Sequence, residues 1–77
     1  MPKLPPVTGA DVLKALRRGG FVFNRQSGSH VILKDRERDL TVSVPTHSAR
    51  DLPPGTLRGV LRQANLTVED FRKLLDG

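Results

Sequence analysis

Three β-type runs separated by very short turns constrain the fold of this 77-residue chain more than any other feature. The runs cover residues 21–26, 29–35 and 40–44. A Ser-Gly pair separates the first two, and the charged stretch Arg-Glu-Arg-Asp separates the last two. Both are turn signals. Because parallel strands need a crossover of about a dozen residues or more, the three runs predict an antiparallel meander.

A helix is predicted before the strands, after an extended, proline-rich lead-in over residues 1–7. Thr8 and Asp11 have the spacing of a capping box, in which each side chain bonds the other residue's backbone N–H. Apolar residues at helical spacing follow, and a Gly-Gly pair then favours a helix end. The pattern predicts a helix over residues 9–18.

Two more helices are predicted after the strands. Pro45 ends the third strand because proline cannot donate to the hydrogen-bond ladder. After a loop, the second helix begins at Pro54 or Gly55 and ends at Asn65. A short third helix begins after Thr67, which forms another capping box with an aspartate three residues on.

The predicted order, α-β-β-β-α with a short C-terminal helix, indicates an α+β fold of the double-stranded-RNA-binding type. In this architecture the helices cover one face of a three-stranded antiparallel sheet. We expect residues 1–77 to form one domain. The sequence has no cysteine, so no disulfide reinforces the fold, and we expect a modest stability of no more than roughly 3–5 kcal/mol.

The charge balance points to an acidic partner. Thirteen Lys and Arg against eight Asp and Glu give a formal net charge of +5. Nucleic acid is the first expectation, an acidic protein the second, and a charge that serves solubility alone the third. No signal peptide, membrane span, cofactor motif or cluster of metal ligands is evident, so we expect a cytoplasmic protein without a cofactor or metal.

One of the two histidines stands at the start of the second strand. Gly28 makes the tight turn, Ser29 follows, and His30 is placed where a strand side chain still reaches solvent. His30 and Lys34 point to one face of the sheet, although apolar residues on both faces leave open which face is buried. Arg25 should lie close by, across the turn.

Such a histidine suits RNA cleavage, because RNA carries its own nucleophile, the 2′-hydroxyl. Histidine exchanges protons near neutral pH, and Lys or Arg stabilises the charge on the phosphorus in the transition state. Each residue also has a structural interpretation. His30 can be a surface residue, Ser29 a turn residue, His47 a loop residue, and Arg58 and Arg62 a solvated helix face.

Two segments of the chain resemble HicA-type (YcfA-like) toxins of bacterial toxin–antitoxin pairs, in a similarity that runs from about Thr8 to Leu75. The first is the Gly-Phe…Gly-Ser-His segment, and the second is the Pro-x-His…Gly-Thr-Leu-Arg segment. Their residues are Gly20, Phe21, Gly28, Ser29 and His30, then Pro45, His47, Gly55, Thr56, Leu57 and Arg58. Both segments in this order, at this spacing, are specific to the family.

The resemblance implies a double-stranded-RNA-binding-like fold and ribosome-independent cleavage of mRNA, with His30 as the key residue and Ser29 as its candidate assistant. It also implies a HicB-type antitoxin that covers His30. For RNA binding the candidates are Arg25, Lys34, His47, Arg58 and Arg62. The central helix lacks the paired lysines with which double-stranded-RNA-binding domains hold phosphates, so duplex binding does not follow from the fold.

Two other functions remain open at this stage. The first is a non-catalytic RNA-binding module that uses the same basic surface, although the chain has no Tyr or Trp and only three Phe for base stacking. The second is a DNA-reading helix-turn-helix in residues 56–75. The short, mixed-charge second helix of that pair suits the major groove badly.

Overall fold

The computed structural model describes residues 3–46 and 48–77. Its elements follow the predicted order of one helix, three strands and two helices. They are α1 (Gly9–Arg18), β1 (Val22–Ser27), β2 (His30–Asp35), β3 (Leu40–Pro45), α2 (Pro54–Ala64) and α3 (Val68–Asp76). The α+β fold of the double-stranded-RNA-binding type is thus confirmed.

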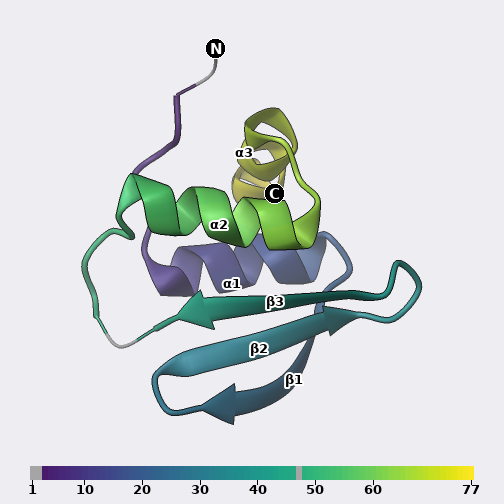
Figure 1. The fold of residues 1–77 in the computed structure, drawn as a ribbon. Helices are drawn as coiled ribbons and strands as arrows, with labels where there is room; N and C mark the ends of the chain where they lie inside the picture. Colours follow the sequence, from purple (N-terminus) through teal and green to yellow (C-terminus); the bar gives the residue numbers. More distant parts are fainter. Residues whose placement is uncertain (1–2, 47) are drawn as a thin grey trace.

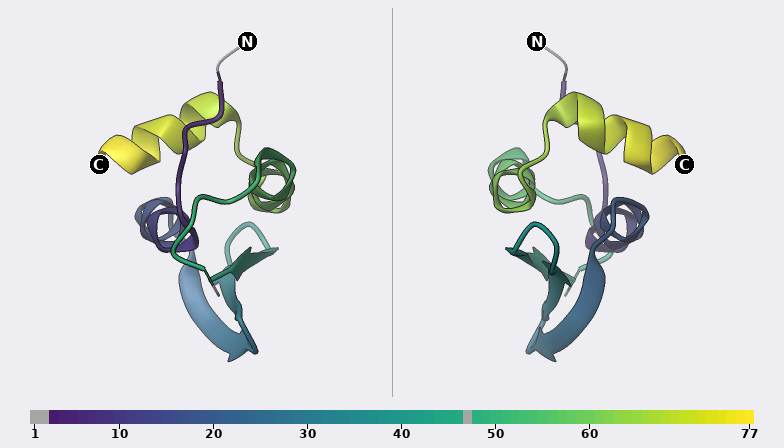
Figure 2. Two further views of the ribbon diagram at one scale, coloured as in Figure 1. Left: turned by 90° about the vertical axis from the view of Figure 1, so that its left-hand side faces the viewer. Right: turned by 90° about the vertical axis from the view of Figure 1, so that its right-hand side faces the viewer.

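The molecule is layered, with the sheet below and the helices above it (Figure 1). The sheet is antiparallel with the strand order β1-β2-β3. Side views show α1 and α2 lying next to each other over one face of the sheet, and α3 crossing above them (Figure 2). α2 packs mainly on β3 and α3 mainly on α1, while β1 curves away from the helices and is held chiefly by β2.

The core lies between the sheet and the helices, and it decides which face of β2 is buried. Val31 and Leu33 are buried in it, whereas His30 and Lys34 are exposed on the opposite face. Strand alternation therefore directs His30 away from the helices. Every residue of β1 is exposed, including Phe23 at 52%, because no helix covers this strand.

The helix ends form as their local sequences predict. The Thr8–Asp11 capping box is complete, and the Thr67–Asp70 box at the start of α3 is complete as well. Asn65 ends α2 with a positive φ of 57°. α2 itself begins at Pro54 without a side-chain cap.

The first strand is shifted by one residue from its predicted range of 21–26. It begins at Val22 and ends at Ser27. Phe21 instead lies in the core at 2% exposure, where its ring stacks against the Arg38 guanidinium, 5.5 Å from the ring centroid. Burying the Phe21 ring stabilises the fold by about 2 kcal/mol or more. This gain exceeds what strand pairing at position 21 would contribute, so the strand begins one residue later.

Candidate functional site: the His30 end of the sheet

A two-residue hairpin turn places His30. Ser27 pairs with His30 across the turn, so only Gly28 and Ser29 form it. Gly28 has a φ of +58°, and Ser29 has no positive φ. A positive φ at the first of two turn residues is the pattern of a type II′ turn, which strongly favours glycine there. Gly28 therefore stands at the turn position where glycine is favoured.

The hairpin is fastened to the end of β3 through the backbone. His30 pairs with Pro45, and the carbonyl oxygen of Ser29 accepts two hydrogen bonds from Thr46. The backbone N–H of Thr46 donates over 2.7 Å and its hydroxyl over 3.1 Å. The first residue of α1, Gly9, also lies against this strand end, because a Cβ at Gly9 would collide with the carbonyl oxygen of Pro45. Helix α1 therefore approaches this strand end as closely as a backbone can.

A hollow of about 420 Å³ opens beside His30. It lies where the end of β3, the loop after it and the first turn of α2 meet. Its lining consists of His30, Pro45, Ser48, Arg50, Asp51, Leu52, Pro53 and Thr56. Among the residues that the structure describes, the side chains of His30, Arg50 and Thr56 form no hydrogen bond, so they remain available to a ligand.

Contacts with the N-terminal lead-in hold the loop over residues 48–53 in this position. The backbone N–H of Leu52 donates to the carbonyl of Val7 over 2.8 Å, and Asp51 forms an isolated antiparallel bridge with Thr8. Val7 is buried at 5% exposure. The loop is also tightened locally, because the N–H of Arg50 donates to the Ser48 hydroxyl over 3.0 Å.

Sequence reasoning missed the loop residues of this hollow. The sequence pattern places Ser48, Arg50 and Asp51 in a loop and Thr56 in a family motif, and it assigns none of them to the site. The usable signal was the stretch between the strand-ending Pro45 and the start of α2. Because the third strand pairs with the second, the loop that follows Pro45 must begin next to His30.

The predicted RNA-binding residues lie in two separate places. Arg25 pairs with Ile32, so it lies on the His30 face of the sheet, and Lys34 lies farther along that face. A strand rise of about 3.3 Å per residue puts the Lys34 Cα roughly 13 Å from that of His30. Arg58 and Arg62 are exposed on α2 and do not line the hollow. His47 falls outside the described residues.

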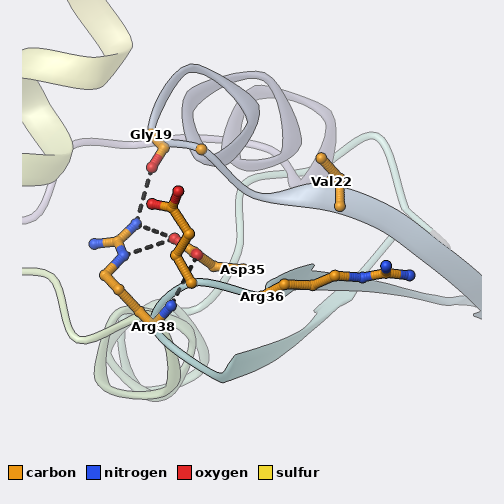
Figure 3. A pocket seen from close by; sticks show the side chains of 7 residues that line it. Gly19, Val22, Asp35, Arg36 and Arg38 are labelled. Atoms are coloured by element: carbon orange, nitrogen blue, oxygen red, sulfur yellow. Dashed lines mark hydrogen bonds and ion pairs between the residues drawn. The ribbon is translucent and has the colours of Figure 1, made fainter.

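A larger hollow, of about 650 Å³, lies at the opposite end of the sheet. There the guanidinium of Arg38 bonds the carboxylate of Asp35, at 2.6 Å from Nε and 2.5 Å from Nη2. The same guanidinium donates to the carbonyl of Gly19 over 2.9 Å (Figure 3). These polar groups are satisfied by one another, so this hollow is a structural junction between the β2–β3 turn and the end of α1.

The charge on Asp35 is stabilised by its turn. The backbone N–H of Arg38, followed by the Arg38 side chain, lowers the pKa of this carboxyl below its usual value of 3.8. Asp35 is 7% exposed, and among the described polar side chains it is the buried one. A buried carboxylate with such partners belongs to the fold rather than to a reactive site.

The described part of the chain has neither a cluster of metal ligands nor a membrane-spanning helix. Residues 3–46 and 48–77 contain no group of three or more His, Asp or Glu residues arranged to hold a metal ion. In the same residues no helix is long and apolar enough to cross a membrane.

Comparison with known proteins identifies the family. Residues 9–66 match the family described as "HicA toxin of bacterial toxin-antitoxin". This span runs from the first residue of α1 to just beyond α2 and includes the His30 hairpin and the whole lining of the hollow. No curated protein gave a significant match. The match covers most of the chain, and the chain therefore belongs to the HicA family of toxins from bacterial toxin–antitoxin systems.

Proposed function

We propose that this toxin is a metal-independent endoribonuclease that cleaves mRNA without the ribosome and uses His30 in the chemical step. The observation that carries the proposal is the position of His30. It stands exposed at a hairpin, on the rim of a hollow whose lining includes Arg50 and Thr56, and its ring has no hydrogen-bond partner among the described residues. A proton-transfer residue must be within hydrogen-bond reach of its substrate, and this one is open to a phosphate.

The chemistry needs one attack and two proton movements. The 2′-oxygen of a ribose attacks the adjacent phosphorus, and the bond from that phosphorus to the 5′-oxygen breaks. The 2′-hydroxyl loses a proton and the departing 5′-oxygen gains one, which leaves a 2′,3′-cyclic phosphate and a 5′-hydroxyl. His30 carries out one of these transfers and solvent carries out the other. Ser29, the neighbour of His30 in the turn, is the candidate for orienting the ribose.

Positive charge on the His30 face supports RNA as the substrate. Arg25 and Lys34 share this face, and the chain carries a net charge of +5. Contacts between such residues and phosphates position an RNA strand without reading its sequence. Arg58 and Arg62 lie on α2, on the helix side of the sheet (Figure 2), and could contact only a longer RNA that also passes that side. His47 remains a candidate for RNA binding.

The proposal includes an antitoxin and a cellular setting. Membership in a toxin–antitoxin family implies an antitoxin partner. We place a HicB-type antitoxin over His30 and the hollow, with its carboxylates occupying the phosphate positions, and we place both proteins in the cytoplasm. The toxin domain is proposed to span residues 1–77, because Phe71 of α3, beyond the family match, is fully buried in the common core.

The test is RNA cleavage by the purified protein in the presence of a chelator. Wild-type protein should cut single-stranded RNA and leave 2′,3′-cyclic phosphate ends. His30→Ala should lower the rate by about 10²- to 10⁴-fold, which is the usual contribution of a general acid or base. Its thermal unfolding midpoint should stay unchanged because His30 is exposed. Addition of the antitoxin should stop cleavage by the wild-type protein.

Three results would count against the proposal. Strict dependence on magnesium, or 3′-hydroxyl ends, would exclude the 2′-hydroxyl mechanism. Full activity of folded His30→Ala protein would remove His30 from the chemistry. RNA binding without cleavage would instead indicate the alternative function, a non-catalytic RNA-binding module.

A further inference from the structure

The hollow beside His30 contains few charged groups. Of the described residues that line it, Arg50 is the cation besides the histidine, and Asp51 is the acid. The other lining side chains are neutral. Arg25, Lys34, Arg58 and Arg62 are the arginines and the lysine predicted for RNA binding from sequence, and they do not line the hollow.

A phosphate that enters the hollow meets Asp51 as well as Arg50. With neutral His30 the two opposite charges cancel, and the hollow has no net charge. Without Arg50 it would have a net charge of −1 facing a phosphodiester that is itself negative. Two like unit charges about 4 Å apart repel by roughly 1–4 kcal/mol, depending on how much water lies between them. Arg50 therefore changes the net charge that a phosphate would meet in this hollow from −1 to zero.

From this charge arrangement, which rests on the proposed function, we infer that Arg50 binds the scissile phosphodiester and stabilises the negative charge that develops on its non-bridging oxygens. The guanidinium suits this role because its planar fork of N–H donors can bond two phosphate oxygens at once. His30, which lines the same hollow, then transfers the proton while Arg50 stabilises the charge.

Backbone contacts fix the position of Arg50 in the loop, whereas its side chain forms no hydrogen bond among the described residues. Its own N–H is bonded to the Ser48 hydroxyl, and the next two residues are fixed to the lead-in through the Thr8–Asp51 bridge and the Val7–Leu52 hydrogen bond. Its guanidinium forms no ion pair among the described residues. A cation that is positioned by its backbone and not yet neutralised loses little when it binds a phosphate.

The experiment compares three variants of the full chain in the cleavage assay. Arg50→Ala should lower kcat/KM by roughly 10²-fold, the usual loss when one transition-state donor is removed. Arg50→Lys keeps the charge and should recover part of that loss, short of the wild-type rate, because lysine lacks the forked geometry. Arg36→Ala is the matched control, since it removes the same charge from the exposed turn at the far end of the sheet.

A binding measurement separates a phosphate contact from a purely structural role. The probe is a single-stranded RNA with 2′-O-methyl riboses, which lacks the nucleophile and cannot be cleaved. Arg50→Ala should bind it more weakly than Arg36→Ala does, with an unchanged thermal unfolding midpoint. Asp51→Asn should bind it at least as tightly as wild type, because that change removes the repelling charge.

The outcomes distinguish this inference from the proposed function. If wild-type protein does not cleave RNA, the proposed function fails. If wild-type protein cleaves and Arg50→Ala retains the activity of Arg36→Ala, the role of Arg50 is refuted while the proposed function stands. A greater loss of cleavage with Arg58→Ala than with Arg50→Ala would refute it too, since it would place the phosphate outside the hollow.

Discussion

The two ends of the sheet are held together in different ways. At the far end, side chains make the stabilising contacts, because the Arg38 guanidinium bonds both the Asp35 carboxylate and the carbonyl of Gly19. At the His30 end, the main contacts involve backbone atoms. The Ser29 carbonyl accepts from Thr46, the first residue of α1 lies against the backbone of Pro45, and the loop after β3 bonds the lead-in.

This difference explains why the smaller hollow is the candidate site. A polar side chain that is already bonded to a neighbour must break that bond before it can bind a ligand. Breaking it is costly where one partner, such as the Asp35 carboxylate, is buried. At the far end the charged groups of Asp35 and Arg38 are committed in this way. At the His30 end the backbone maintains the shape, so His30 and Arg50 remain free for RNA.

The largest effect on stability is expected from Gly9→Ala, at the His30 end. The new methyl group would collide with the Pro45 carbonyl, and neither backbone can move without disturbing the buried face of α1. Such overpacking costs about 1–3 kcal/mol in the free energy of unfolding, to be measured by urea denaturation. The cost is large for a domain of this size.

Gly59→Ala is the matched control for that change. Gly59 lies within α2, and a Cβ there meets nothing within 4 Å. Alanine is the better helix former, so this substitution should raise the free energy of unfolding by up to about 1 kcal/mol. If both alanine variants change stability in the same direction, the close approach of α1 to β3 is not a constraint at this end.

The next largest effect is expected from Arg38→Ala, at the far end. The change leaves the buried Asp35 carboxylate without its guanidinium and frees the Gly19 carbonyl. The thermal unfolding midpoint should fall by several degrees, although less than for Gly9→Ala because the Arg38 side chain is 45% exposed. RNA cleavage below the midpoint should be retained.

Arg36→Ala is again the control, since Arg36 extends away from the Asp35–Arg38 pair (Figure 3). Its unfolding midpoint should match that of the wild type. A loss of cleavage by folded Arg38→Ala protein would mean that the far end takes part in function, and the contrast between the two ends would then be wrong.

The smallest effect concerns acid. Because the folded state lowers the pKa of Asp35, its ionised form is bound more favourably in the folded than in the unfolded chain. Its contribution to stability is therefore fully present above the unfolded value of 3.8 and is lost as the pH falls through the lower folded-state pKa. As the pH drops below about 4, the urea midpoint of the Asp35→Asn variant should therefore fall less steeply than that of the wild type.

Some acid sensitivity should persist in that variant. The pKa of Asp70 is also lowered, first by the backbone N–H of Thr67 and then by its hydroxyl, so the α3 capping box weakens over the same pH range. In a double variant that combines Asp35→Asn with Asp70→Asn, the urea midpoint should depend still less on pH. Equal slopes for wild type and Asp35→Asn would show that the Asp35–Arg38 pair does not contribute to acid stability.

Local sequence signals predicted the helices and the turn well. The two capping boxes, at Thr8 and Thr67, formed as expected, as did the positive-φ turn at Gly28 and the helix end at Asn65. Each depends on contacts within about four residues, so no tertiary information was needed. The position of His30 at the mouth of β2 followed from the same signals.

The buried face of the sheet was not predictable from the strands themselves. Val31 and Leu33 lie on one face of β2 and Ile32 lies on the other. Because both faces carry apolar residues, the alternation did not show which face is buried. The packing of α1 and α2 on one face settled it. For the same reason the apolar start of β1 did not reveal that Phe23 stays exposed while Phe21 joins the core.

By itself, the sequence determined the order of elements, the hairpin that presents His30 and, through the HicA family motifs, the class of protein. Only the tertiary structure decided which residues share the hollow with that histidine. Arg50 and Thr56 are distant from His30 along the chain, and they meet it because the lead-in bonds the loop at Leu52 and because α2 packs on β3. Contacts of this range depend on the packing of the whole chain, which no local pattern records.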